Sequence, residues 1–178
     1  MADGTLKVGT ITNSAGSGNI TIGSGVTLLS NVPAFAASVT SDQSISSATW
    51  TKIQFDNEIL DTNNAYDPTT NYRFTVPTGQ AGKYYVCLDY VSCSNSDNLI
   101  YSILGIRKNG TMFKRSDMNS NGTSNAAFRR FQVNSSTIEN LNAGDYIEAF
   151  AYISATSPFI NGDDVETRSF FGAYRIGT

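Results

Sequence analysis

From Pro33 to the end of the chain, apolar and polar residues alternate in short runs that are separated by turns rich in glycine, proline or asparagine. In the segment 82–93, GKYYVCLDYVSC, the even-numbered residues from Tyr84 to Tyr90 fall on one face, as in a half-buried strand. Asn109-Gly110 is a strong hairpin turn. No stretch of ten or more residues places apolar side chains at helical spacing. The pattern predicts an all-β, antiparallel jelly-roll sandwich of about ten strands.

Two segments carry finer predictions. In 51–59, TKIQFDNEI, the apolar side chains of Ile53, Phe55 and Ile59 alternate with polar ones, so one continuous half-buried strand is expected. The apolar phase of the strand that follows residue 125 changes at Arg129–Arg130, which indicates a β-bulge there. The aromatic side chains that we expect in the core are those of Tyr66, Phe74 and Tyr84.

The segment 146–153, YIEAFAYI, is apolar on both faces. Its odd-numbered residues are aliphatic, and its even-numbered residues are mostly aromatic. Phe170 and Phe171 also point to opposite sides of the last strand. Because the outer face of a sandwich strand is normally polar, outward aromatic side chains indicate a covering surface. That surface is either a loop of the same chain or another subunit, and we favour a subunit. The predicted interface residues are Tyr146, Phe150, Tyr152 and Phe171.

The first 31 residues differ from the rest, because they are rich in glycine and contain no aromatic residue and no proline. Their β-branched residues indicate two short strands around a glycine turn, which carry too little apolar surface to be stable alone. We therefore expect this segment to pair with copies of itself or with a larger assembly; the alternative is a disordered tail. The predicted anchor residues are Leu6, Val8, Ile11, Ile20 and Ile22.

The sequence offers little for catalysis. It contains no histidine, which excludes Ser-His-Asp and Cys-His systems and most zinc and non-haem iron sites. Neither cysteine belongs to a CxxC pair, and no glycine cluster matches a nucleotide-binding motif. We expect no enzymatic activity.

Asp163, Asp164 and Glu166 form the acidic cluster that we weighed as a site. Carboxylate oxygens suit calcium or an acid/base pair. The favoured alternative is an acidic loop before the last strand, since adjacent side chains in an extended chain point apart. Calcium is therefore a weak candidate, and no other cofactor is expected.

Charge and hydropathy argue against nucleic-acid and membrane partners, and the cysteines indicate the compartment in which the protein is made. The net charge of −3 and the isoelectric point near 4.8 argue against nucleic-acid binding. No apolar run approaches the roughly 20 residues that span a bilayer, and the first ten residues lack the features of a secretory signal. Cys87 and Cys93 lie too far apart along one predicted strand to pair unless the chain folds back. We expect free thiols, in a protein made in a reducing cytoplasm.

The order of these features resembles the globular head of complement component one, subcomponent q, over about four-fifths of the chain. Residues 33–37, PAFAA, are similar to the first strand of that domain. Residues 53–86 are similar to its central signature, in which the motifs F-D, Y-D, F-T-x-P and G-x-Y-Y follow one another. Its hairpin is similar to KNG (108–110). The last two strands are similar to LNAGDYIEAF (141–150) and SFFGAY (169–174). The resemblance implies the trimeric jelly roll of the tumour necrosis factor superfamily, with the outward aromatic residues of the last two strands near the axis.

Some features depart from that family. Asn71 stands where a glycine is usual, and Thr75 replaces a frequent cysteine. No collagen-like repeat precedes the domain; residues 1–31 are instead similar to short N-terminal segments of tailed-bacteriophage virion proteins. Together the resemblances imply a trimeric virion surface protein that is assembled in the bacterial cytoplasm. Residues 1–31 would attach it to other virion proteins, and residues 33–178 would form an exposed knob.

A knob of this kind would bind a host-surface glycan or receptor through many weak contacts. The polar loops 94–98, 117–125 and 158–166 are the places where we expect a ligand. Two rival functions stay open: a cement or decoration protein that only stabilises the capsid, and, less favoured, a carboxylate-based glycan hydrolase. The candidate ligand residues are Asn95, Asp97, Asn98, Asn119, Asn121, Asn161 and Asp163.

Overall fold

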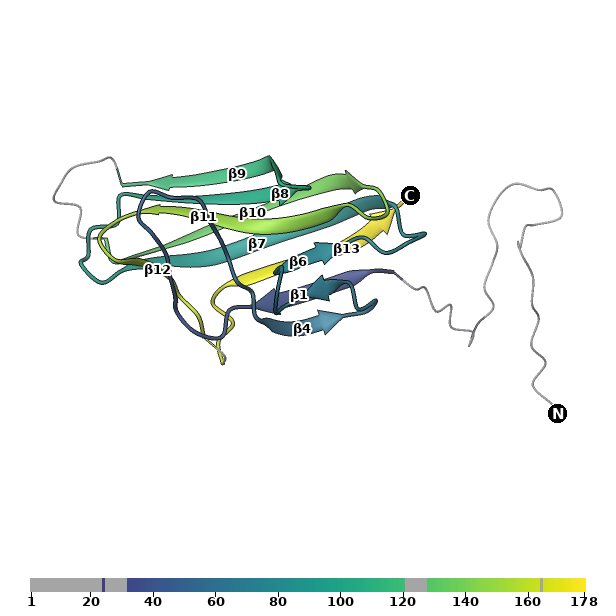
Figure 1. Cartoon of the computed structure of the whole chain (residues 1–178), viewed down its shortest axis with the longest axis horizontal. Coiled ribbons are helices and arrows are strands. Elements are labelled where there is room, and N and C mark those ends of the chain that lie inside the picture. The colour runs from purple at the N-terminus through teal and green to yellow at the C-terminus, as the bar shows by residue number, and fades with distance from the viewer. Residues whose placement is uncertain (1–23, 25–31, 121–127, 164) are drawn as a thin grey trace. The chain divides into compact units, whose positions relative to one another are not determined.

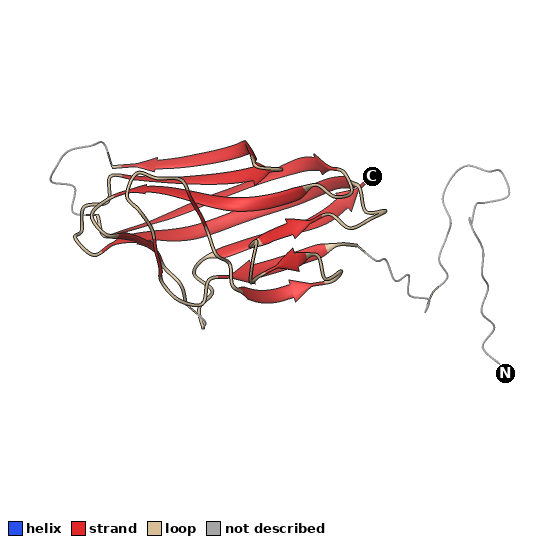
Figure 2. Ribbon diagram, in the orientation of Figure 1, coloured by secondary structure: helices blue, strands red, loops and turns tan. Residues whose placement is uncertain are grey.

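The computed structural model describes residue 24 and residues 32–120, 128–163 and 165–178 of the chain. In these residues all regular structure is β, in thirteen strands, and Figure 2 shows them linked by loops and turns without a helix. The part of the chain that is described has no helix that would be long and apolar enough to cross a membrane. The predicted anchor residues from Leu6 to Ile22 lie outside the described residues, as do Asn121 and Asp164.

The strands form two antiparallel sheets (Figure 1). In the first, which we call sheet A, the long strand β7 pairs along one edge with β10 and along the other with β13 and then β12. The order in sheet A is β2 (Gln43–Ser44), β12 (Pro158–Ile160), β7 (Gly82–Ser94), β13 (Phe170–Gly177), β1 (Ala34–Ser38) and β4 (Asn57–Asp61), with β10 (Arg130–Leu141) beside β7.

The second sheet, sheet B, is built around β11, which pairs with β8 along one edge and with the short strands β3 and β6 along the other. The order in sheet B is β5 (Tyr66–Asp67), β6 (Arg73–Thr75), β11 (Tyr146–Ser154), β8 (Tyr101–Lys108) and β9 (Thr111–Asn119), with β3 (Thr51–Lys52) beside β11. The predicted all-β jelly roll is confirmed, with more strands than expected because three of them have only two residues.

The inward faces of the two sheets enclose one aromatic core. Phe35 of β1 stacks on Tyr66 and on Phe74, both from sheet B, with 4.8 Å between ring centroids in each pair. Phe171 of β13 meets Phe35 edge-on at 5.0 Å, and Tyr84 of β7 packs against Phe74. Rings from both sheets thus alternate through the core. The predicted core positions of Tyr66, Phe74 and Tyr84 are confirmed.

Two turns have backbone conformations that their residue types favour. Asn109 and Gly110 both have positive φ, 51° and 81°, as a two-residue turn between antiparallel strands requires, and they link β8 to β9. After β5, the carboxylate of Asp67 accepts hydrogen bonds from the backbone N–H groups of Thr69, Thr70 and Asn71. The Asn71 side chain also donates to Asp67, at 2.7 Å. This turn therefore uses an asparagine where the resembled family has a glycine.

The prediction of one strand over residues 51–59 is wrong. Ile53 and Phe55 are fully buried, but Ile59 is 50% exposed. The chain leaves sheet B after β3 and enters sheet A as β4, so the alternation restarts between the two strands. Apolar and polar residues still alternate on both sides of such a crossing, but the positions that point into the core change there.

The bulge predicted at Arg129–Arg130 is also absent from the strand. The register between β10 and β7 runs without a shift from Arg130 opposite Cys93 to Leu141 opposite Gly82. The change of phase has a simpler cause, because Phe128 precedes the strand and packs beside Phe131, with 5.2 Å between the rings.

Phe171 does not belong to an interface, which corrects the sequence-based assignment. Its side chain is fully buried within a single chain, between Phe35 and Phe55. The neighbouring Phe170 is half-buried and faces the other side of β13. The two cysteines are free, as expected.

Replacing Phe171 by alanine should therefore lower the free energy of unfolding by about 3–5 kcal/mol, the usual cost of removing a buried phenylalanine. Phe170→Ala is the matched control and should cost clearly less, because its ring is half-buried on the outer face. Chemical denaturation at a fixed protein concentration measures both. Equal losses would contradict the inward position of Phe171.

The Asp67 turn gives a prediction that depends on pH. Hydrogen bonds from the backbone of Thr70 and Thr69 lower the pKa of Asp67 well below its ordinary value. A lowered pKa in the folded state means that the stabilisation is complete above the unfolded pKa of about 3.9 and is lost as the pH falls through the folded value. Asp67→Asn should cost about 1 kcal/mol at neutral pH. Denaturation curves of the two proteins should converge as the solution is acidified, and a difference that grows below pH 4 would contradict this account.

Candidate functional site

The outward face of sheet B carries a row of aromatic side chains that the chain covers with its own residues. The guanidinium of Arg73 lies 4.3 Å from the ring of Tyr146, and that of Arg107 lies 3.9 Å from the ring of Phe150. Such cation–π contacts stabilise partly exposed rings. A second subunit is therefore not needed to explain the apolar outward face of β11.

Between these rings lies a charge pair that fixes β3 against β11. Glu148 is buried on the outward side of β11 and pairs with the ammonium group of Lys52. The same ammonium group donates to the backbone carbonyl of Asn71 at 3.0 Å. Because an unpaired carboxylate would be costly at this depth, Lys52 explains how an acidic residue fits among aromatic ones.

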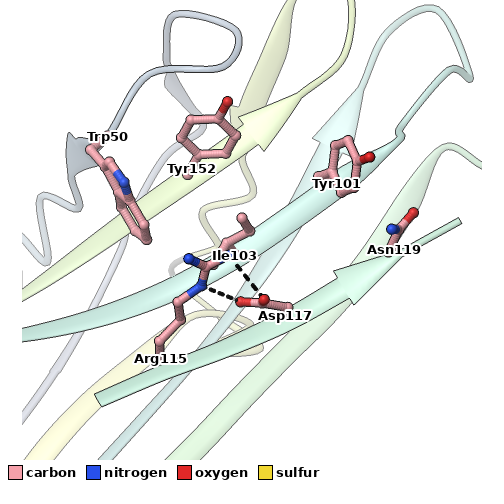
Figure 3. A pocket seen from close by; sticks show the side chains of 7 residues that line it. All are labelled: Trp50, Tyr101, Ile103, Arg115, Asp117, Asn119 and Tyr152. Atoms are coloured by element: carbon pink, nitrogen blue, oxygen red, sulfur yellow. Dashed lines mark hydrogen bonds and ion pairs between the residues drawn. The ribbon is translucent and has the colours of Figure 1, made fainter. Parts of the chain in front are cut away.

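A cavity of about 370 Å³ opens on this face, and we call it the Trp50 cavity (Figure 3). Three neighbouring strands form its floor. Tyr152 of β11 lies opposite Ile103 of β8, which lies opposite Asp117 of β9. Tyr101 lies opposite Asn119 one row further along. The residues that line the cavity are Trp50, Tyr101, Ile103, Arg115, Asp117, Asn119 and Tyr152.

A glycine positions the indole. Trp50 directly precedes β3, and its ring lies 5.6 Å from that of Tyr152. On β8, Gly105 has no side chain to occupy the space above the sheet: a Cβ atom there would lie 2.9 Å from the Trp50 ring and 2.5 Å from the end of the Met112 side chain. Trp50 can pack over the sheet because residue 105 is a glycine.

The polar wall of the cavity is a bidentate ion pair between Arg115 and Asp117, which we call the Arg115–Asp117 fork. Arg115 and Asp117 are two residues apart on β9, so their side chains share one face. Nε of Arg115 donates to one oxygen of Asp117 at 2.7 Å, and a terminal nitrogen donates to the other oxygen at 3.0 Å. Figure 3 shows both groups pointing into the cavity beneath the aromatic rings. The pair is about half exposed, so its hydrogen-bonding groups remain accessible.

The outward face of sheet A has a different character. Ile138, Tyr85, Tyr174 and Ala34 lie side by side across β10, β7, β13 and β1, and the two tyrosine rings are 5.4 Å apart. Ile138 is 57% exposed and Tyr174 is 49% exposed. This group is called the Tyr174 row below.

Next to the Tyr174 row the side chains are small. Ser136, Cys87, Gly172 and Ala36 form the adjacent row across the same strands, and a shallow hollow of about 240 Å³ lies there. The following row contains Asp89, whose Oδ2 accepts a hydrogen bond from Gln132 at 2.7 Å. Burial raises the pKa of Asp89. The row of small residues between Asp89 and the Tyr174 row thus contains no charged side chain.

The thiols are poorly suited to nucleophilic chemistry. Burial raises the pKa of both Cys87 and Cys93 above the ordinary value. They therefore stay protonated at neutral pH, and the reactive thiolate is scarce.

The candidate ligand residues of loop 94–98 hold that loop in place. The Asn98 side chain bonds to Ser94 at 2.9 Å and to the Thr156 hydroxyl at 2.7 Å. Asp97 lies 4.0 Å from Arg129. Asn95 lines a separate hollow beside Pro158 and Phe159. The structure brings this loop to the loop after β11, but it does not bring it to the Trp50 cavity.

Asp163 and Glu166, the acidic residues of the cluster before β13 that the structure describes, are already paired. Oδ1 of Asp163 accepts hydrogen bonds from the backbone of Val165 and Glu166, both at 2.9 Å. These bonds, followed by the charge of Arg168, hold the pKa of Asp163 below its ordinary value. Arg168 lies between Asp163 and Glu166 and pairs with both. A calcium ion would have to displace this guanidinium, and no group of three potential ligands gathers among the described residues.

Asn161 also has a structural role. Its side chain donates to Asp42 at 2.7 Å and so links β12 to the loop before β2. Of the candidate ligand residues that the structure describes, Asn119 is the one that lines the Trp50 cavity.

Sequence reasoning missed most of the Trp50 cavity. Tyr152 was assigned to a subunit interface, and Asp117 fell within the candidate ligand loop 117–125. Trp50, Tyr101 and Arg115 were not assigned at all. Available signals were the single tryptophan of the chain, the glycine within β8, and the Arg-Ser-Asp spacing that puts two opposite charges on one strand face.

No protein-family profile and no curated protein matches the chain. Solved structures do match it. The crystal structure of murine APRIL at pH 5.0 superposes with a TM-score of 0.60 at 11% identity and covers 82% of this chain and 99% of that one. The globular domain of zebrafish complement 1qA protein gives a TM-score of 0.55 at 15% identity, over 81% and 97%. The tumour necrosis factor Eiger from S. frugiperda gives 0.59 at 12%, over 83% and 94%.

At such low identity the likeness shows the fold alone. The chain has the jelly-roll fold of the tumour necrosis factor and complement 1q domains, as the sequence resemblance implied.

Proposed function

We propose that the chain forms a homotrimeric, non-enzymatic knob on the surface of a bacteriophage virion, where residues 33–178 bind a host-surface ligand. The observation that carries the trimer is the Tyr174 row, together with the small, weakly charged row beside it. Exposed aromatic and aliphatic side chains on a flat sheet face are typical of surfaces that pack against another protein.

The proposal places the contact between subunits on sheet A. The sequence-based interface combined residues of β11 and β13, but these strands belong to opposite sheets and their outward faces point in opposite directions. One three-fold axis can pass beside only one of the two faces. The rings of β11 have partners within the chain, whereas Tyr174 and Ile138 remain about half exposed.

The virion part of the proposal is supported by the sequence of residues 1–31, which resembles the N-terminal segments of tailed-phage proteins. It places the protein on the virion surface, attached to other virion proteins through Leu6, Val8, Ile11, Ile20 and Ile22. Three knobs per trimer, repeated over a particle, would gain avidity from weak single sites.

Tyr174→Asp tests the interface, because it puts a charge in the middle of the Tyr174 row. Light scattering should show a trimer of three 19.2 kDa chains for the parent protein and a monomer for the variant. Phe150→Asp is the matched control on the opposite face and should remain a trimer. A monomeric Phe150→Asp beside a trimeric Tyr174→Asp would move the interface to sheet B.

Deletion of residues 1–31 tests the attachment. The truncated protein should keep the cooperative unfolding of the jelly roll, because the core cluster of the described residues runs from Phe35 to Ala173 and is retained. It should no longer join particles in a sedimentation assay. Incorporation at the level of the full chain would show that the knob itself carries the attachment. Particles without the protein that adsorb normally but lose heat resistance would favour the cement function instead.

A further inference from the structure

We propose that the Trp50 cavity binds a neutral sugar residue of a surface polysaccharide. The proposal rests on the binding role proposed above and gives that role a site and a ligand class. Asp117 and Asn119 of the cavity belong to the predicted loop 117–125, but the rest of its lining lies outside the three polar loops in which the sequence placed the ligand, on the outward face of sheet B and just before β3.

The aromatic side chains supply the apolar part of the site. Trp50 from the residue before β3, Tyr101 from β8 and Tyr152 from β11 surround the opening (Figure 3). Each ring is partly exposed, and Tyr101 is 39% exposed. A pyranose ring has a face of C–H groups, and such a face packs against an aromatic ring in the same way as other apolar groups do. These rings therefore offer flat surfaces to a sugar.

The Arg115–Asp117 fork supplies the polar part. A sugar hydroxyl both donates and accepts, so it can accept from a guanidinium N–H while it donates to a carboxylate oxygen. Hydrogen bonds to ionised groups are stronger than those between neutral groups. Because two hydrogen bonds between Arg115 and Asp117 hold both side chains in place, these side chains need little further ordering when a sugar binds.

The charge balance selects a neutral ligand. The cavity is lined by one cation and one anion, and these neutralise each other. An acidic sugar would need a cation that is not already paired with a carboxylate. A volume of about 370 Å³ falls in the lower part of the range for small-molecule sites, which suits one or two sugar units and excludes a folded protein.

The position of the cavity agrees with exposure on a knob. Pro33 lies at the end of the sandwich where β7 begins, because its carbonyl accepts from Arg175 and Gly177 pairs with Lys83. β7 ends at Ser94, which bonds to Thr156 just beyond β11. Tyr101 pairs with Ser154 near that far end. The cavity thus faces away from the Tyr174 row and lies toward the end opposite the start of the domain.

The single tryptophan makes the test specific to the site. Trp50 is the only tryptophan in the chain, so its fluorescence, excited selectively over tyrosine, reports the cavity alone. The full-length protein is titrated with glucose, galactose, mannose, N-acetylglucosamine, cellobiose and lactose, and separately with glucuronic acid and N-acetylneuraminic acid. We expect a saturable change with at least one neutral sugar, at a dissociation constant on the order of 1 mM for a single shallow site.

Substitutions of lining residues test whether the fluorescence change comes from a sugar bound in the Trp50 cavity. Tyr101→Ala should weaken binding roughly three- to tenfold, as expected for the loss of one aromatic contact, whereas Tyr101→Phe keeps the ring and should bind nearly as the parent does. Asp117→Asn should also weaken binding, because it removes the carboxylate to which a sugar hydroxyl would donate. Phe128→Ala is the matched control, because Phe128 is an aromatic side chain of similar exposure that does not line the cavity.

No saturable change with any neutral sugar would overturn the proposal, as would an equal loss in Phe128→Ala and Tyr101→Ala. Tighter binding of glucuronic acid than of glucose would overturn the neutral ligand class. Light scattering on the same samples keeps the two proposals separate. A trimer that binds no sugar contradicts the cavity alone, and a monomer that binds sugar contradicts the trimer alone.

Discussion

The stack of aromatic rings between the two sheets is the contact on which the rest of the structure depends. Phe35 lies between Tyr66, Phe74 and Phe171, so it joins the first strand of the domain to the last strand and to the opposite sheet. The Tyr66 hydroxyl also donates to the backbone of Phe55 at 2.9 Å, which satisfies its polar end within the core. Since these rings set which side chains of each strand face inward, they also set which side chains remain outside.

The two outer faces that result are chemically different. On sheet B, arginine and lysine side chains cover the rings of β11, and the remaining opening combines aromatic rings with a charge pair. On sheet A, tyrosine, isoleucine and small residues lie side by side with little charge. In the two proposals above, the face of sheet B binds a small polar ligand and the face of sheet A packs against neighbouring subunits around a three-fold axis. A single sandwich can therefore assemble through one side and bind through the other.

Most of the fold could be predicted from the sequence, because strand alternation and turn residues are local signals. The face of Tyr84, the Asn109-Gly110 turn and the aromatic core were all predicted correctly. Ile59 was misplaced because alternation does not reveal where a chain crosses from one sheet to the other. The Trp50 cavity was missed because its lining comes from strands that are distant in sequence and become neighbours only through the register of sheet B.

The place of β1 has a mechanical consequence. β1 lies between β13 and β4 and is hydrogen-bonded to both, and the carbonyls of Pro33 and Ala34 extend that bonding at its N-terminal end. A pull on the chain at Pro33, directed along the strand, would have to shear two rows of hydrogen bonds at once instead of peeling them one by one. The domain is therefore built to resist tension that is applied through Pro33 along β1.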